Sequence, residues 1–592
     1  MVHLPAKCCC MNNFFRSFFA ALLALIVFSG MLLVIFIVMV AAISSQKKAG
    51  IEEKAVMVVN LSTHFPEIPP ADIISEITDN RSAQPSLSHL TRLIQHAKND
   101  ASVKGIYLKC DNNANDFASS EAIRNAIIDF RRAGKFVIGY GATISQKAYL
   151  VASAADKIYC APAGGIEWHG FSMTMPFIKG TLEKMEIEPQ IFYAGKFKSA
   201  TEPLRETEMT DANRVQSITL LNDLYGNFLS TIGRSRRMDT ATLHRYADSN
   251  ALQFASDALK YKMVDGLRYD DEVKDEIRQL LKIDKDAGIN FITPSKYAEA
   301  VDYMPSGDEK IAVIYAEGTI LDGKGDRGEI GGDTYRNYIR KARMDNSTKA
   351  IVVRINSGGG SAMASEVMWR EIILARKVKP VIVSLGDVAA SGGYYMACGA
   401  DSIFAEANTI TGSIGVFGVL PNMEKFFNNK LGVTFDEVKT SPDAGFVTVT
   451  KPLTPLQKRY FQNSIDTIYQ NFKMKVSSGR KKSMEYIDSI AQGRVWSGTR
   501  ALEIGLVDRI GGLDDAIRSA AAKAGVKRYH LREYPGKEGL LEMIFGSQGE
   551  SREAAIRDEI GEEGYKTYTA IRSLKKFLGK AQARLPFEMI IE

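Results

Sequence analysis

A serine followed by two glycines stands where an apolar run gives way to a possible helix, in the stretch GDVAASGGYY that ends at Tyr395. The first N–H groups of a helix point toward a neighbouring anion, and the helix dipole favours negative charge there. Ser391 beside the N–H of Gly392 therefore has the arrangement of a nucleophile next to an oxyanion hole. The alternative interpretation is that Ser391 only caps the helix, as serines often do.

A second glycine-rich turn, NSGGGS at residues 356–361, also lies between an apolar run and a possible helix. Glycine allows tight turning and leaves backbone N–H groups uncovered, so such a turn can present donors to a ligand. A plain connection between a strand and a helix is the alternative interpretation of this stretch.

A serine hydroxyl is a weak nucleophile unless a base lies beside it. No histidine occurs between His244 and His530, which excludes a Ser-His-Asp triad built within that part of the chain. We expect His169, which comes earlier, to be structural. A lysine can serve as the base when burial or cationic neighbours depress its pKa. The segment AGKFKSATEP offers two lysines among apolar residues, Lys196 and Lys198, although a solvated loop is the alternative.

The chain contains one segment twice, because residues 104–159 align without a gap with residues 349–404 at a constant offset of 245. Where the second copy has Ser391 and two glycines, the first copy has Gln146, a lysine and an alanine. An internal repeat decides how the whole fold is interpreted. The loss of the serine from one copy predicts one reactive centre per chain.

Short apolar runs alternate with segments of helical character in both halves, which predicts βαβ units, a mainly parallel sheet and an α/β fold. The polar stretch at residues 302–310 contains proline and glycine and is typical of a boundary between the halves. The expected strands cover residues 55–60, 103–108, 136–139, 311–315, 350–355 and 381–384, and the clearest expected helices cover residues 120–133 and 365–378.

The composition of the 592 residues, with 45% hydrophobic and 24% charged residues, is ordinary for a globular protein. The net charge is only +6 and the basic residues are scattered, so no nucleic-acid partner is expected. The six cysteines form no CxxC pair, which argues against a disulfide framework and a zinc site. We expect neither a metal nor a cofactor.

Residues 17–45 carry no charge and are mostly apolar. The run is longer than the roughly 20 residues that a helix needs to cross a bilayer. The apolar core of a secretory signal peptide is shorter, about 7–15 residues. We therefore expect a single transmembrane anchor at residues 17–45 after an N-terminal segment at residues 1–16, although the flanking charges do not decide its orientation.

Five motifs together resemble signal peptide peptidase A, also called protease IV, in its long duplicated form within peptidase family S49. The motifs are GDVAASGGYYMA, NSGGGS, AGKFKSATEP, ITGSIGVFG and GRVWSGTRALEIGLVDRIGGLDDAI. The resemblance runs from about residue 50 to residue 530 and implies two tandem repeats with a crotonase-like, Clp-protease-like fold. The first repeat, residues 50–301, would supply a lysine, and the second, residues 308–530, a serine. We expect residues 531–592 to form a helical tail.

The resemblance implies that Ser391 is the nucleophile and that Lys198 is the general base, with Lys196 as a second candidate. It also implies that Gly360 and Gly392 are the oxyanion donors. The sequence departs from the family at Gly358, where proline is usual, and we expect this change to loosen the turn before the oxyanion glycines.

The function implied by the resemblance is a membrane-bound serine endopeptidase that degrades signal peptides left in the membrane after preprotein processing. It would act through a Ser/Lys dyad and an acyl-enzyme, as a homotetramer in the bacterial inner membrane with a periplasmic catalytic part. Two other classes stay open, namely a crotonase-type acyl-CoA enzyme and a non-catalytic membrane scaffold.

Overall fold

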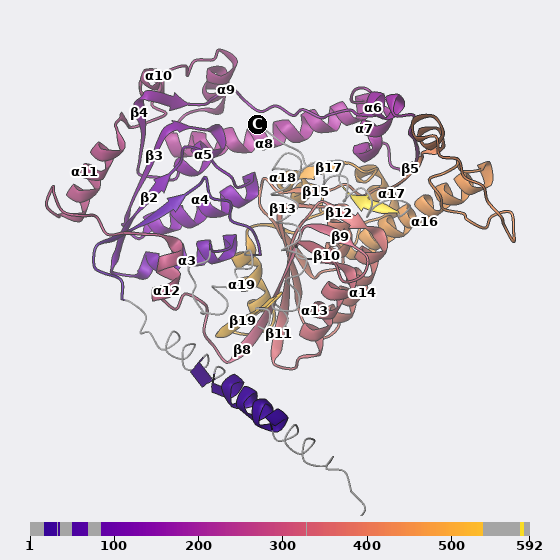
Figure 1. Cartoon of the computed structure of the whole chain (residues 1–592). Coiled ribbons are helices and arrows are strands. Elements are labelled where there is room, and N and C mark those ends of the chain that lie inside the picture. The colour runs from indigo at the N-terminus through magenta and orange to yellow at the C-terminus, as the bar shows by residue number, and fades with distance from the viewer. Residues whose placement is uncertain are drawn as a thin grey trace, which may run out of the picture.

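Two α/β halves lie side by side in the computed structural model (Figure 1), which describes residues 17–31, 34–35, 50–68, 84–326, 328–536 and 581–584. Each half has its own apolar core of strand and helix side chains. The α/β class predicted from the alternating pattern is confirmed. Both halves contain a mainly parallel sheet flanked by helices, as short buried strands joined by helices require.

The first half is built on a six-stranded parallel sheet in the order β6-β4-β3-β2-β1-β7. Its strands are β1 (Ala55–Asn60), β2 (Val103–Lys109), β3 (Phe136–Ile144), β4 (Lys157–Ile166), β6 (Gly266–Leu267) and β7 (Phe291–Ile292). The helices are α3 (Leu87–Asn99), α4 (Phe117–Arg132), α5 (Gln146–Ala152), α6 (Lys179–Lys184), α7 (Glu202–Arg205), α8 (Asp211–Arg236), α9 (Thr240–Asp248), α10 (Ala255–Lys260), α11 (Asp270–Leu281) and α12 (Pro294–Ala300).

The second half contains an eight-stranded sheet whose main path runs β17-β15-β13-β11-β8-β19, with β14 and β18 branching from β13. These strands are β8 (Glu309–Glu317), β11 (Thr348–Ser357), β13 (Val381–Ala390), β14 (Ser402–Ala405), β15 (Ile410–Gly412), β17 (Val495–Ser497), β18 (Arg509–Ile510) and β19 (Tyr529–Tyr534). The helices are α13 (Gly332–Met344), α14 (Ala362–Arg376), α15 (Gly392–Ala397), α16 (Pro455–Arg480), α17 (Met484–Ile490), α18 (Gly498–Glu503) and α19 (Leu513–Lys523).

The repeat found in the sequence is a repeat of structure. Helices α3 and α13 have the same length and are related by the offset of 245, and strands β3 and β13 begin at positions related by the same offset. The offset also relates the first residues of α4 and α14. The two halves therefore share one succession of elements, which confirms the duplication.

A third, mixed sheet joins the halves in the order β10-β9-β12-β20-β16-β5. Strand β5 (Glu188–Ala194) belongs to the first half and pairs antiparallel with β16 (Val416–Asn422) of the second half. The remaining strands are β9 (Thr319–Leu321), β10 (Glu329–Gly331), β12 (Gly359–Ser361) and β20 (Gln582–Arg584). Helix α8 also reaches across the boundary (Figure 1), because Leu220 and Leu224 pack against Ala390, Ile410 and Val495.

The expectation of a helical tail at residues 531–592 is wrong for the two stretches of it that the structure describes. Strand β19 crosses the expected boundary at residue 530 and pairs in parallel with β8, and β20 pairs with β12 and β16. These stretches were missed because a short strand that pairs with segments far away in the chain is recognised by its partners and not by its own short pattern. The other residues of the expected tail lie outside the described residues.

Residues 17–31 form a helix (Figure 1). Among the residues that the structure describes, no helix has the length and apolar character needed to cross a membrane. The expected N-terminal segment at residues 1–16 and much of the expected anchor at residues 17–45 lie outside the described residues. The anchor therefore stays a prediction.

Candidate active site

Ser391 stands between the end of β13 and the start of α15, in a backbone conformation that is rare for a residue with a side chain. Its φ is +53° and its ψ is −112°. Such strained residues cluster at functional sites, where the surrounding structure holds them. The Ser391 N–H donates to the carbonyl of Gly412 at 2.8 Å, and its carbonyl accepts from the Tyr395 N–H at 2.7 Å. Its side chain makes no capping hydrogen bond, which removes the capping interpretation.

Lys198 from the first half meets Ser391 from the second half. The Lys198 Nζ lies 2.9 Å from the Ser391 Oγ, and both side chains are buried. Lys196, the other candidate, is exposed, and its ammonium group lies over the ring of Phe197 at 5.8 Å from the ring centre. Of the two lysines that the sequence offered, the structure brings Lys198 to the serine.

Burial controls the protonation state of Lys198, whose side chain is only 2% exposed. Its hydrogen-bond partners in the described structure are the hydroxyls of Ser391 and Ser413 and the carbonyl of Ser413, all uncharged. Because no negative charge offsets the loss of water, burial lowers the pKa of Lys198 from 10.5 to about 7. A large share of the amine is therefore neutral near neutral pH and can accept a proton.

Ser413 is a residue of the site that the sequence analysis did not single out. Its Oγ lies 2.9 Å and its carbonyl oxygen 3.3 Å from the Lys198 Nζ. It precedes β16 within the motif ITGSIGVFG. That motif contributed to the family resemblance, but it did not indicate that Ser413 contacts Lys198. Because Ser413 offers two acceptors, two protons of the Lys198 amine point toward Ser413. The remaining position on the amine nitrogen faces the Ser391 hydroxyl. The site thus contains a second serine that orients the lysine.

The pairing of β5 with β16 places Lys198 beside the serines. Ala194 at the end of β5 lies opposite Val416 at the start of β16. Beyond this pair, the Phe197 N–H donates to the carbonyl of Gln492 at 2.7 Å. Gly493 packs so closely that a Cβ built on it would lie 2.7 Å from the Lys198 Cα. The lysine segment is therefore clamped between β16 and the turn at residues 492–493.

The two glycines expected to donate to an oxyanion lie together. A Cβ built on Gly392 would lie 3.2 Å from the N of Gly360, and one built on Gly359 would lie 2.8 Å from the N of Gly392. The turn that carries Gly360 is stabilised by two hydrogen bonds of the Ser357 side chain. The Ser357 Oγ accepts from the Gly359 N–H at 3.1 Å and donates to the carbonyl of Gly318 at 2.6 Å. Ser357 thus supports the turn by two hydrogen bonds, and the expectation that Gly358 loosens it stays a prediction.

Comparison with known proteins assigns both halves of the chain to one family. The model of "Peptidase family S49" matches residues 129–284 of the first half and 373–527 of the second half. The chain belongs to peptidase family S49. Its relatives show that it is a serine protease, with "Protease 4" of Salmonella typhi 37% identical over 492 residues. That match covers 82% of this chain and 79% of the relative.

Two further relatives cover most of this S49 protease. "Protease 4" of Haemophilus influenzae is 36% identical over 444 residues, which are 72% of this chain and 71% of the relative. "Serine protease SPPA, chloroplastic" of Arabidopsis thaliana is 32% identical over 478 residues, which are 79% of this chain and 70% of the relative. The similarity therefore extends over both halves and not over one repeat alone.

In the first half of this S49 protease, Gln146 stands at the position equivalent to Ser391, at the start of α5. Its side-chain oxygen accepts from the N–H groups of His169 and Gly170, and its amide donates to the Gly170 carbonyl at 3.0 Å. The side chain of His169 is exposed. This turn therefore has a structural glutamine where the second half has the serine.

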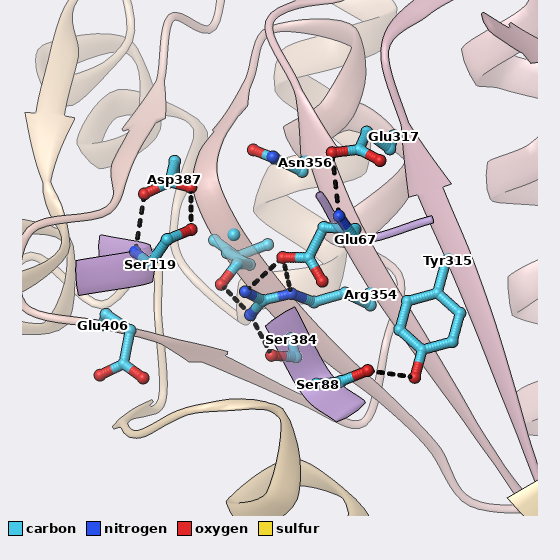
Figure 2. Close-up of polar contacts among 12 residues, drawn as sticks. Glu67, Ser88, Ser119, Tyr315, Glu317, Arg354, Asn356, Ser384, Asp387 and Glu406 are labelled. Atoms are coloured by element: carbon cyan, nitrogen blue, oxygen red, sulfur yellow. Dashed lines mark hydrogen bonds and ion pairs between the residues drawn. The ribbon is translucent and has the colours of Figure 1, made fainter. Parts of the chain in front are cut away.

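A buried ion pair connects the two halves (Figure 2). Arg354 on β11 forms an ion pair at 2.6 Å with Glu67 of the first half, and both side chains are 3% exposed. Arg354 also donates to the Ser384 Oγ at 2.9 Å and to the Leu385 carbonyl at 2.7 Å. The Glu67 N–H donates in turn to Glu317 at 3.2 Å. The guanidinium therefore links the first half to β11 and β13.

Asp387 makes a second link between the halves, four residues before Ser391 (Figure 2). It accepts hydrogen bonds from the N–H of Ser119, at 2.8 Å, and from the Ser119 hydroxyl, both at the start of α4 in the first half. Burial raises the pKa of Asp387. The strand that ends at Ser391 is thus attached directly to a helix of the half that supplies Lys198.

Proposed function

We propose that this S49 protease is an endopeptidase with a Ser391/Lys198 dyad and that it degrades signal peptides left in a membrane after preprotein processing. The observation that carries the dyad is the 2.9 Å contact between the buried Lys198 Nζ and the Ser391 Oγ. The lowered pKa of Lys198, about 7, supports the same roles, because a general base must be neutral to accept a proton.

In this mechanism, neutral Lys198 takes the proton of the Ser391 hydroxyl while the Ser391 Oγ attacks the scissile carbonyl carbon. The N–H groups of Gly360 and Gly392 stabilise the negative charge that develops on the carbonyl oxygen. The ammonium of Lys198 then gives its proton to the leaving amine, and an acyl-enzyme remains on Ser391. A water molecule loses a proton to Lys198 and attacks the ester carbonyl carbon, and the Lys198 ammonium returns that proton to the Ser391 Oγ as the bond to the acyl group breaks.

An apolar cavity beside the site supports a hydrophobic peptide as substrate. It has a volume of about 290 Å³ and lies between β5, β16 and α16, with Phe192, Leu420, Phe461 and Ile465 among its lining residues. Peptide pockets of this kind recognise side chains through apolar contact. Signal peptides carry an apolar core of about 7–15 residues and therefore fit such a surface.

The membrane anchor, the homotetramer and the periplasmic side of the bacterial inner membrane belong to the same proposal and rest on the resemblance and on the uncharged stretch at residues 17–45. Light scattering on the detergent-solubilised chain measures the assembly, and a mass other than that of a tetramer would refute it. Protease accessibility in spheroplasts measures the side of the membrane, and protection of the catalytic part would place it in the cytoplasm.

A fluorophosphonate probe of reactive serines tests the dyad in the detergent-solubilised full chain. We expect labelling of the wild type and of the control Lys196→Ala, and no labelling of Ser391→Ala or Lys198→Ala. Persistent labelling of Lys198→Ala would mean that another group is the base. A folded wild type without labelling would overturn the dyad, and hydrolysis of acyl-CoA thioesters by the same preparation would favour a crotonase-type enzyme.

The substrate class needs a separate measurement on the active chain. We expect a synthetic signal peptide in liposomes to be degraded at least about tenfold faster than the same peptide with charged residues in its apolar core, because the apolar cavity would have to desolvate those charges. Equal rates for the two peptides would refute the preference for signal peptides and leave the serine protease activity in place.

A further inference from the structure

Strand β20, close to the C-terminus, lies between β12, which carries Gly360, and β16, which follows Ser413. On one side it pairs antiparallel with β12, with Ala583 opposite Gly360 and Arg584 opposite Gly359. On the other side Gln582 lies opposite Phe417 of β16, the strand that follows Ser413. The segment therefore completes the mixed sheet at the position next to Ser391.

The carbonyl of Ala583 lies beside the two glycine N–H groups of the proposed oxyanion hole. A Cβ built on Gly359 would lie 2.0 Å from the Ala583 carbonyl oxygen and 2.8 Å from the N of Gly392. One built on Gly392 would lie 3.0 Å from the same oxygen and 3.2 Å from the N of Gly360. Ala583 itself is fully buried. A substrate carbonyl awaiting attack would have to lie in this place.

The side chains of the segment alternate between two cavities, as those of an extended peptide do. Ala581 lines the apolar cavity of about 290 Å³ together with Phe192 and Phe461. Gln582 lines a different, polar cavity with Asp322 and Lys324. The alanine fills little of a cavity that has room for a large apolar side chain.

The segment does not satisfy all of its buried polar groups in this position, which lowers the cost of displacing it from the sheet. In the described part of the chain, the Gln582 Oε1 is buried without a hydrogen-bond partner. A buried acceptor without a partner opposes binding of the segment that carries it. A peptide without this penalty, and with a larger side chain in the apolar cavity, would bind the same groove more favourably.

We propose that β20 occupies in cis the groove in which peptide substrates bind, so that the chain obstructs its own site until the strand is displaced. This inference rests on the proposed peptidase site. An extended peptide that adds a strand to a sheet gains main-chain hydrogen bonds whatever its sequence. A segment of the same chain is also present at an effective concentration on the order of millimolar, which favours the closed groove over weakly bound peptides.

Peptide binding to full-length chains carrying Ser391→Ala tests the occupancy without any catalysis. The probe is a fluorescent peptide copied from residues 579–586. Ala583→Arg places a long charged side chain in a fully buried position, and Ala583→Pro removes a strand N–H, so both should release β20. Ala583→Gly is the matched control, because it creates no clash and keeps the N–H.

We expect the probe to bind the Ala583→Arg and Ala583→Pro chains at least about tenfold more tightly than the control and the parent, since a site open only a small fraction of the time loses affinity by that fraction. Equal affinity for all four chains, or no binding to any of them, would overturn the inference. Thermal midpoints within a few degrees of the parent would show that the variants are folded.

Fluorophosphonate labelling of the same Ala583 variants with Ser391 intact separates this inference from the proposed function. About tenfold faster labelling of Ala583→Arg than of Ala583→Gly supports both. Equal labelling of both forms, with no shift in probe affinity, refutes the occupied groove and leaves the dyad standing. A shift in probe affinity with no labelling of any form refutes the dyad and retains the groove.

Discussion

At the scale of single residues, the site combines a serine in a strained backbone conformation with a lysine whose side chain is buried away from solvent. Both features oppose folding, because the positive φ of Ser391 and the burial of Lys198 each cost free energy. Such costs persist in a protein where the arrangement serves its chemistry, and stability is commonly given up at active sites for this reason.

The pH dependence of peptide hydrolysis should report Lys198. Because burial lowers its pKa to about 7, the neutral base is lost as the pH falls below this value. We expect kcat/KM to fall roughly tenfold per pH unit below about pH 7 and to level off above it. A steady-state series on one peptide substrate measures this. A profile that keeps rising to the ordinary lysine range, near pH 10, would contradict the lowered pKa.

Replacing Lys198 with methionine should abolish hydrolysis and yet stabilise the fold. Between pH 7 and 10.5 the unfolded lysine holds a proton that the folded lysine has lost, so the burial of this lysine costs stability. The cost is full below about pH 7, shrinks as the pH rises from 7 to 10.5, and is gone above 10.5. After subtracting the lost hydrogen bonds, we expect Lys198→Met to gain about 1–3 kcal/mol at neutral pH. Denaturant midpoints at two pH values measure the effect, and a loss of stability at both would contradict it.

Ser413 should act through the orientation of Lys198 rather than through substrate binding. We expect Ser413→Ala to lower kcat by about 10–100-fold with little change in KM, because the amine loses a hydroxyl that fixes its rotation. Ser402→Ala in β14 removes another buried serine and is the control. An effect on KM alone would mean that Ser413 contacts the substrate and does not position the base.

At the scale of elements, the pairing of β5 with β16 and the turn at residues 492–493 decide where the lysine lies. Strand pairing has a side-chain period of two, so a shift by one residue would turn every side chain of β5 to the other face. The turn adds a second constraint, because Gly493 has a φ of +78° and contacts the backbone of Lys198. The position of the base therefore depends on backbone that lies about 300 residues further along the chain.

Gly493→Ala and Gly525→Ala together separate backbone strain from displacement of the lysine. Both glycines have positive φ, so each alanine costs about 1 kcal/mol of strain. A Cβ on Gly493 would also lie 2.7 Å from the Lys198 backbone, whereas nothing lies within 4 Å of one on Gly525. We expect hydrolysis to fall at least about tenfold only in Gly493→Ala. Equal activity of the two variants would contradict the clamping of the lysine.

At the scale of the whole molecule, the proposed catalytic centre draws one residue from each half. The halves are joined by the β5–β16 pairing, by packing of α8 on the second half and by the buried pair of Arg354 and Glu67. A buried ion pair adds little net stability, but removing one partner leaves an uncompensated charge. The pair is therefore a strong constraint on how the halves fit together.

Arg354→Met should destabilise the chain by about 3–5 kcal/mol, because Glu67 would stay buried without its partner. The double variant Arg354→Met with Glu67→Leu should recover much of this loss, since it leaves no unpaired charge. Denaturant midpoints of the parent, both single variants and the double variant give the coupling energy. Additive losses in the double variant would mean that the two side chains do not interact.

The sequence by itself determined the central strands of the two halves and the single serine. Periodicity and apolar runs located three strands and one helix of each half, since local backbone preference and burial are encoded in each segment. The repeat with Gln146 in place of Ser391 indicated one reactive centre per chain. The absence of histidine from the part of the chain around Ser391 made a lysine the candidate base. These conclusions need only short-range information or a comparison of one segment with another.

Only the tertiary structure decided which groups meet. From the residues alone Lys196 and Lys198 were equivalent, and the resemblance preferred Lys198, but the distance to Ser391 is set by β5 pairing with a strand more than 200 residues away. Ser413 and β20 were missed for the same reason. A serine before a strand and a three-residue strand have no local signature, because their roles come from partners that the chain folds against them.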